Sequence, residues 1–260
     1  MTNFTITTLD WNNEYLPQTH KSNYSTLIVS GCSFTDSTRT KDIPVSWPGY
    51  VKERCRLNRV LNLGASACGN EYIATSIVNQ IESMSDSELE DSIVLIVWSG
   101  IDRQENLIYN QKIPTYPYID DVQFVRANKW STDQVDPDIA HSEALRSWKN
   151  IMLTHHYLKS KGVAFGFSFY INVFDPPFLP RRDKTIELPG VLTPEKIQQL
   201  RGCQWINDHN DSLFEWCFYN DHNDSYFEPD LFHPSSCGYL AWTDSVLLPA
   251  LVRAKYIQLL

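Results

Sequence analysis

The chain has 260 residues, which is enough for one large domain with its own apolar core. Its net charge of −9 argues against a nucleic-acid backbone or an anionic membrane surface as the main partner. No stretch approaches the roughly 20 apolar residues that span a bilayer, and the polar start of the chain lacks the features of a signal peptide. We therefore expect a soluble, cytoplasmic protein in which residues 1–260 form a single domain.

Hydrophobic patterning predicts alternating strands and helices along the chain. The apolar run Leu27–Val29 predicts a first buried strand, which breaks at Gly31. The later elements are a helix over 46–57, a strand over 60–63, a helix over 71–84, a strand over 92–98, a helix over 141–161, a strand over 163–170, a short helix over 194–202 and a final helix within 235–260 that is interrupted at Pro249. This alternation predicts the α/β class, with three layers in which helices cover both faces of a central parallel sheet.

Two stretches do not fit this pattern. Residues 104–140 and 175–228 are rich in aromatic residues, Pro and Asp, and show little periodicity. Long connections of this kind are often functional loops, so we interpret 104–140 as an insertion over the functional site and 175–228 as a second irregular insertion.

The first strand and the end of the chain carry the candidate chemistry. Ser33 follows the first strand, at the edge of the sheet where ligands bind in open α/β folds. A serine nucleophile needs an imidazole to accept its proton and a carboxylate to orient that imidazole. The motif Asp230-x-x-His233, flanked by Pro229 and Pro234, supplies both groups.

The order of the motifs resembles that of the SGNH hydrolases, also called GDSL-type esterases and lipases. The resemblance rests on four blocks, namely Gly31-x-Ser33, Asn62 to Asn70, Trp98 to Arg103, and Asp230-x-x-His233. It covers nearly the whole chain as an ordered set, apart from the two insertions. The resemblance implies a flavodoxin-like α/β fold and serine esterase activity.

The resemblance also implies roles for individual residues. Ser33 would be the nucleophile and, through its backbone N–H, the first donor of the oxyanion hole. His233 would be the base and Asp230 the residue that orients it. The N–H of Gly69 would be the second oxyanion donor, with Gly64 as the alternative.

Two positions depart from the family pattern. Cys32 stands where the family usually has Asp, outside the triad. Ile101 stands where the family has an Asn whose side chain is the third oxyanion donor, and an isoleucine side chain has no donor. Ser99 is our candidate for the missing donor, with Arg103 as the alternative.

The other patterns predict no metal and no cofactor. The six cysteines match no zinc spacing, so we expect free thiols. The tracts 208–211 and 221–224, both Asp-His-Asn-Asp, lack the regular ligand spacing of a calcium loop and are interpreted as solvated loops. Several tryptophans could stack on sugars or belong to the core, namely Trp47, Trp98, Trp130 and Trp205.

These patterns predict a serine esterase that acts on a small-molecule or carbohydrate ester, such as an O-acetylated sugar. The alternative is a weakly active or inactive module of the same fold that binds a carbohydrate or a protein, with Ile101 as the sign of lost catalysis. A third reading, acyl transfer to an acceptor other than water, uses the same residues. The patterns do not indicate the oligomeric state.

Overall fold

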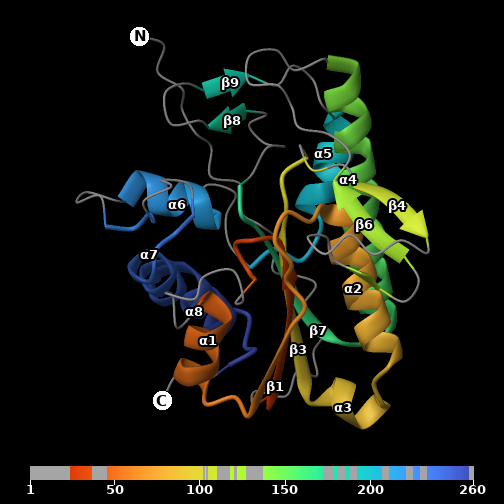
Figure 1. Ribbon diagram of the computed structural model, residues 1–260. Helices are drawn as coiled ribbons and strands as arrows, with labels where there is room; N and C mark the ends of the chain where they lie inside the picture. The colour runs from red at the N-terminus through yellow and green to blue at the C-terminus, as the bar shows by residue number, and fades with distance from the viewer. Residues whose placement is uncertain are drawn as a thin grey trace.

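A four-stranded parallel sheet forms the centre of the computed structural model, which describes residues 24–36, 46–101, 103, 105–109, 118–119, 122–126, 137–171, 178–180, 185–187, 192–206, 211–220, 225–228 and 233–257 (Figure 1). Its strands are, in spatial order, β2 (Arg59–Asn62), β1 (Thr26–Gly31), β3 (Ser92–Trp98) and β7 (Ala164–Phe169). All four strands predicted from the sequence are confirmed, with ends that differ by one or a few residues.

β1 and β3 form the buried middle of this sheet. Every residue of β3 is buried, and only the first residue of β1 is partly exposed. The register pairs Leu27 with Ile93 and Gly31 with Val97, so the two strands end side by side. Because the strands are parallel, their carboxyl ends open onto one edge, which is where ligands bind in this class of fold.

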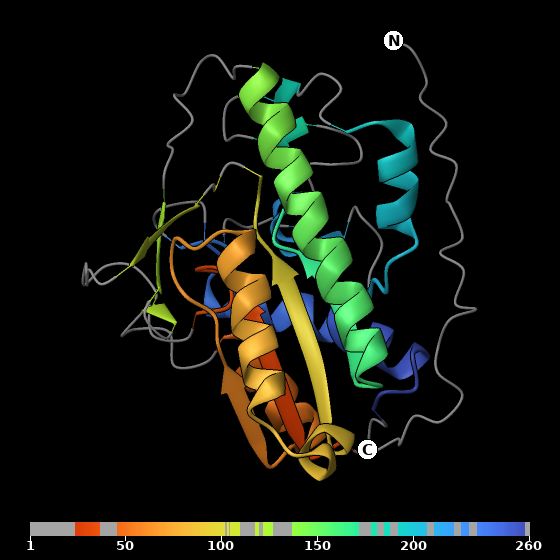
Figure 2. The same cartoon turned by 90° about the vertical axis from the view of Figure 1, so that its right-hand side faces the viewer.

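Helices cover both faces of the sheet, which confirms the predicted three-layer α/β/α architecture. Figure 2 shows α2 and α4 in front of the sheet, with the C-terminal helices behind it. The first layer consists of α2 (Asn70–Glu82) and α4 (Pro137–Ser160), with α5 (Pro194–Arg201) packed on α4. The second layer consists of α1 (Trp47–Cys55), α7 (Ser236–Trp242), η3 (Thr243–Leu247) and α8 (Leu248–Arg253).

The two insertions contain more regular structure than their patterning predicts. The first holds a small antiparallel sheet of β4 (Glu105–Tyr109), β6 (Val122–Arg126) and β5 (Tyr118–Ile119). The second holds the hairpin β8 (Phe178–Pro180) and β9 (Thr185–Glu187), and the helix α6 (Leu213–Asn220). The small sheet is anchored by Phe124, whose ring contacts that of Tyr72 in α2 at 5.4 Å. Glu105 at the start of β4 also contacts α2, through the N–H groups of Gly69 and Tyr72. Strands this short show too little alternation to be recognised in a sequence.

The last helix is interrupted before Pro249, as predicted. The α-helical turns of α7 widen into the π-helical segment η3 and tighten again in α8, whose first turn holds Pro249. Proline lacks an N–H and its ring clashes with the carbonyl four residues earlier, which explains a wider turn there. A short helix that the patterning missed, α3 (Asp86–Glu90), precedes β3.

The described residues bear on three of the minor predictions. All six cysteines are unpaired thiols, as expected. Trp47 and Trp98 are fully buried, and Trp205 stacks on Phe169 with ring centres 4.5 Å apart, while Trp130 lies outside the described residues. In the described part of the chain, no helix is both long and apolar enough to cross a membrane.

Candidate active site

Ser33 lies in a tight turn directly after β1. The carbonyl of Cys32 accepts the N–H groups of Thr35 at 2.8 Å and Asp36 at 3.0 Å, which closes the turn around Ser33. Gly31 is required at the entry, because a Cβ there would lie 2.9 Å from the carbonyl oxygen of Val97 and against the side chain of Thr35. The turn therefore places the serine hydroxyl at the carboxyl edge of the sheet, beside the end of β3.

His233 meets Ser33 across 200 residues of sequence. The hydroxyl oxygen of Ser33 and Nε2 of His233 are 3.0 Å apart, which is hydrogen-bonding distance. The backbone on both sides of the histidine is fixed, since the N–H of Glu228 donates to the carbonyl of His233 at 2.8 Å and the N–H of Ser235 donates to that of Tyr226 at 2.8 Å. The sequence motifs predicted that Ser33 and His233 would meet, and in the structure the two side chains are in contact.

An aromatic side chain, that of Phe34, packs beside the imidazole of His233. The ring of Phe34 lies 5.0 Å from that of His233 and also stacks on Tyr170, just after β7, with ring centres 4.4 Å apart. Phe34 is fully buried, so the imidazole lies against a fixed part of the core. Asp230, the predicted orienting residue, lies outside the described residues.

The loop after β2 is clamped onto the serine turn. The side-chain N–H of Asn62 donates to the carbonyl of Thr35 at 2.7 Å, and Ser66 donates to the carboxylate of Asp36 from both its N–H, at 3.0 Å, and its hydroxyl, at 2.8 Å. The N–H of Gly64 donates to the Asn62 side chain at 2.9 Å. The alternative oxyanion donor, Gly64, thus has its N–H in a bond within its own loop.

Gly69 is also hydrogen bonded, to a residue that the sequence analysis did not single out. Its N–H donates to Oε1 of Glu105 at 2.6 Å, and the N–H of Tyr72 donates to Oε2 at 2.9 Å. The Glu105 carboxyl therefore caps the start of α2 from outside the helix, in the manner that stabilises helix N-termini. An oxyanion could use the Gly69 N–H only if this carboxyl moved away.

Burial raises the pKa of Glu105 from its ordinary value of 4.5 to about 7. The loss of hydration is the largest effect, and the two N–H groups that it accepts oppose it. The side chain thus lies near the midpoint of its titration at neutral pH. No local spacing in the sequence points to Glu105, because it is 36 residues away from the helix end that it caps.

Ala67 is another backbone donor of the same loop. It adopts a left-handed conformation, with φ of +66°, and lies between Ser66 and Cys68, which contact the serine turn at Asp36 and Gly31. Within the described ranges, no group accepts a hydrogen bond from its N–H. No sequence pattern points to Ala67, because alanine is not one of the residue types that favour the left-handed conformation.

Ser99 is locked into the frame of the site. Its N–H donates to Oδ1 of Asn70 at 2.7 Å, and Nδ2 of Asn70 donates back to the Ser99 carbonyl at 3.0 Å and to Ser147 in α4 at 3.0 Å. The Ser99 hydroxyl is enclosed and has no partner in the described part of the structure. Ile101 is also buried, so the position that carries a donor in the SGNH pattern is filled by an apolar side chain.

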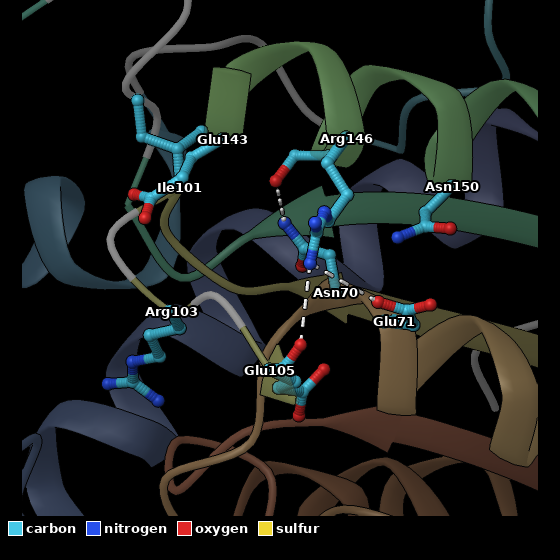
Figure 3. A pocket seen from close by; sticks show the side chains of 9 residues that line it. Asn70, Glu71, Ile101, Arg103, Glu105, Glu143, Arg146 and Asn150 are labelled. Atoms are coloured by element: carbon cyan, nitrogen blue, oxygen red, sulfur yellow. Dashed lines mark hydrogen bonds and ion pairs between the residues drawn. The ribbon is translucent and has the colours of Figure 1, made fainter. Parts of the chain in front are cut away.

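Arg103 is a buried cation in the segment between β3 and β4. Its guanidinium carbon lies 5.0 Å from the centre of the Tyr170 ring. Figure 3 shows it at one side of a small pocket between α2, α4 and the segment after β3. The pocket is also lined by charged residues of both signs, namely Glu71, Glu105, Glu143 and Arg146.

Cys32 and Cys68 are both buried, and Cys68 is poorly suited to chemistry. Burial raises the pKa of the Cys68 thiol well above its ordinary value, and its Sγ contacts the Gly31 carbonyl at 3.3 Å. A protonated thiol is neither a good nucleophile nor a metal ligand. The described residues hold no cluster of three or more side chains that could bind a metal ion, and the tracts 208–211 and 221–224 lie almost wholly outside them.

Among known proteins, the similarities found for this chain are to solved structures. No protein-family model and no curated protein matches the chain. A member of the lipolytic protein G-D-S-L family from Veillonella parvula DSM 2008 is similar with a TM-score of 0.46 and 10% identity, over 88% of this chain and 96% of that one. A second protein named for the same family, from Desulfitobacterium hafniense DCB-2, is similar with a TM-score of 0.46 and 11% identity, over 88% of this chain and 99% of that one. This is the family that the sequence motifs resemble.

Proposed function

We propose that the protein is a serine hydrolase that cleaves an ester bond through an acyl-enzyme on Ser33. The observation that carries the proposal is the 3.0 Å contact between the Ser33 hydroxyl and Nε2 of His233. A serine is a poor nucleophile until an imidazole at this distance accepts its proton. Their meeting across the fold, at the ligand-binding edge of the sheet, supports a catalytic role.

The reaction then follows from these two side chains. Oγ of Ser33 attacks the acyl carbon while its proton moves to Nε2 of His233. The histidine passes this proton to the departing alkoxide, which leaves as an alcohol. His233 next takes a proton from water, the hydroxide attacks the acyl-enzyme, and the proton returns to Oγ as the carboxylic acid departs. Asp230 is proposed to hold the imidazole in the tautomer that this sequence requires.

The tetrahedral intermediate needs hydrogen-bond donors for its oxygen. The N–H of Ser33 is the donor that needs no rearrangement, because no described residue accepts from it. The resemblance adds Gly69 and Ser99. Gly69 would act only after release from Glu105, and the Ser99 hydroxyl only after a movement that exposes it.

The proposed substrate is an ester with a small acyl group on a polar carrier, such as an O-acetylated carbohydrate. Only 7% of Ser33 is exposed, and the Phe34 ring fills the space beside the histidine. A long acyl chain would need an apolar channel to the serine. Acyl transfer to another acceptor uses the same steps, with the acceptor in place of water, and product analysis separates it from hydrolysis.

The test is covalent labelling with a fluorophosphonate probe together with hydrolysis of p-nitrophenyl acetate and p-nitrophenyl decanoate. We expect labelling at Ser33, turnover of the acetate ester, and slower turnover of the decanoate. Ser33→Ala should abolish labelling, and His233→Ala should lower kcat by about 10² to 10⁴-fold. An unlabelled wild-type protein that hydrolyses neither ester would refute the proposal and favour the binding module.

A further inference from the structure

The proposed oxyanion hole lacks a side-chain donor at its usual position. Ile101 is apolar and only 2% exposed, so it offers the oxyanion no hydrogen bond. Gly69 and Gly64 both use their N–H groups in other bonds. Among the described residues, the backbone N–H groups of Ser33 and Ala67 have no acceptor, and neither carries a full positive charge, so a charged donor from a nearby element would add to them.

Arg103 is located over the middle of the sheet edge. On one side its guanidinium faces the Tyr170 ring at the end of β7. On the other side it is close enough to the Cys68 thiol, in the loop after β2, for its charge to lower the pKa of that thiol against the larger effect of burial. Since β1 and β3 lie between β2 and β7, a side chain that reaches both loops lies over the ends of β1 and β3.

Both of these neighbours also contact the serine turn directly. Tyr170 stacks on Phe34, which follows Ser33, and Cys68 Sγ contacts the carbonyl of Gly31, which precedes it by two residues. Arg103 is thus separated from the nucleophile turn by Tyr170 and Phe34 on one side, and its own carbonyl lies against Gly69, the residue after Cys68, on the other. Arg103 and Ser33 are both buried, with 8% and 7% of their surfaces exposed, so both are poorly hydrated.

The backbone that carries Arg103 is held in place from several directions. The Glu105 carboxyl is fixed by two N–H groups at the start of α2, and the Glu105 carbonyl accepts from Arg146 at 3.3 Å. The Arg103 carbonyl lies so close to Gly69 that any Cβ there would clash with it. The backbone from which the guanidinium extends is therefore held in place, and the Tyr170 ring lies against the guanidinium itself, which favours the preorganised charge that transition-state stabilisation requires.

The side chains of Arg103 and Arg146, which both line the pocket, point in different directions. In Figure 3 the Arg103 side chain points away from Asn70 and Arg146, whereas Arg146 points toward Glu105 and Glu71. Arg146 is also partly exposed, with 42% of its side chain accessible. Of these two, only Arg103 has the position and burial for a role at the serine.

We propose that the Arg103 guanidinium is a catalytic residue that donates hydrogen bonds to the oxyanion formed at Ser33, in place of the side-chain donor that Ile101 lacks. The inference rests on the proposed esterase function. The guanidinium keeps its protons throughout, because its pKa is too high for it to act as an acid. Its full positive charge in a poorly hydrated site stabilises a negative oxygen more strongly than a neutral amide does.

The experiment compares Arg103→Ala and Arg103→Lys with wild type, using kcat and KM for p-nitrophenyl acetate. Arg54→Ala is the matched control, because Arg54 pairs with Asp244 on the surface of the second helical layer. We expect Arg103→Ala to lower kcat by about 10² to 10³-fold with little change in KM, as for the loss of one oxyanion donor. Arg103→Lys should retain part of kcat, and Arg54→Ala should match wild type.

Chemical rescue separates a catalytic from a structural role. Guanidinium chloride, at concentrations far below those that unfold the protein, should restore part of kcat to Arg103→Ala and should not raise that of wild type. A kcat within threefold of wild type in Arg103→Ala, or a loss that neither lysine nor guanidinium relieves, would overturn the inference. Fluorophosphonate labelling of wild-type Ser33 tests the esterase proposal itself, so the failure of either proposal can be distinguished from the failure of the other.

Discussion

The burial of Glu105 leads to a prediction about how the free energy of unfolding depends on pH. Its pKa is about 7 in the folded protein and near its ordinary value of 4.5 in the unfolded chain. The folded state therefore binds the proton more tightly, so the stability contributed by this group is full below pH 4.5 and is lost as the pH rises through about 7. Each pH unit between these values is worth about 1.36 kcal/mol, which gives about 3 kcal/mol in total. Glu105→Gln removes this dependence, because the amide resembles the protonated acid and does not ionise.

The assay is urea unfolding of wild type and Glu105→Gln at pH 5 and pH 8, followed by tryptophan fluorescence. All other titrating groups cancel in the difference between the two proteins. We expect the variant to gain about 2–3 kcal/mol relative to wild type between pH 5 and pH 8. Glu88→Gln is the control, since Glu88 is exposed and its capping-box bonds with Ser85 lower its pKa, so it stays ionised over this range. A difference between wild type and Glu105→Gln that is the same at both pH values would refute the reasoning.

Two further substitutions test the serine turn and the helix α4. Gly31→Ala should destabilise the fold by about 1–3 kcal/mol and slow fluorophosphonate labelling, because the new Cβ would press on Thr35 and on the carbonyl of Val97; unchanged labelling and unfolding would contradict the tight turn. His155→Leu should lose less of its free energy of unfolding than wild type as the pH falls from 6.5 through about 4. Burial, with a smaller effect of His156, lowers the pKa of His155 to about 4, so the folded wild type resists protonation of this histidine. Parallel pH profiles of the two proteins in urea unfolding would show that it does not.

The core of the fold could be predicted because its elements carry their own signals. The run from Ile93 to Trp98 is apolar throughout since β3 is covered on both faces, and the helices beside it repeat with helical spacing. α3 was also within reach, since Ser85 and Glu88 form a capping box whose spacing is visible in the sequence. The small sheet of β4, β5 and β6 was not, because pairing between short strands across a loop leaves little periodicity in either strand.

The candidate site divides in the same way. Ser33 and His233 were predictable because each sits in a short motif at a recognisable place in the chain, one after a strand and one before a helix. Glu105 was not, because a carboxylate that caps α2 from 36 residues away leaves no local pattern at Gly69. The predicted role of Gly69 rested on position alone, and position does not show which acceptor an N–H group has already found.

The segment after β3 supports a different interpretation in the structure than it does in the sequence. Judged by the family pattern, Ile101 removes a donor and points to lost catalysis. In the structure the same segment carries two buried charged side chains. The Glu105 carboxyl accepts from the N–H of Gly69 at the start of α2, and the Arg103 guanidinium lies against the ring of Tyr170. A carboxyl that occupies the N–H of Gly69 makes a second source of positive charge more necessary, because the anion formed at Ser33 cannot share that donor while Glu105 holds it. The loss of one amide side chain and the presence of one buried guanidinium are thus best understood together, as alternative ways to stabilise the same negative charge.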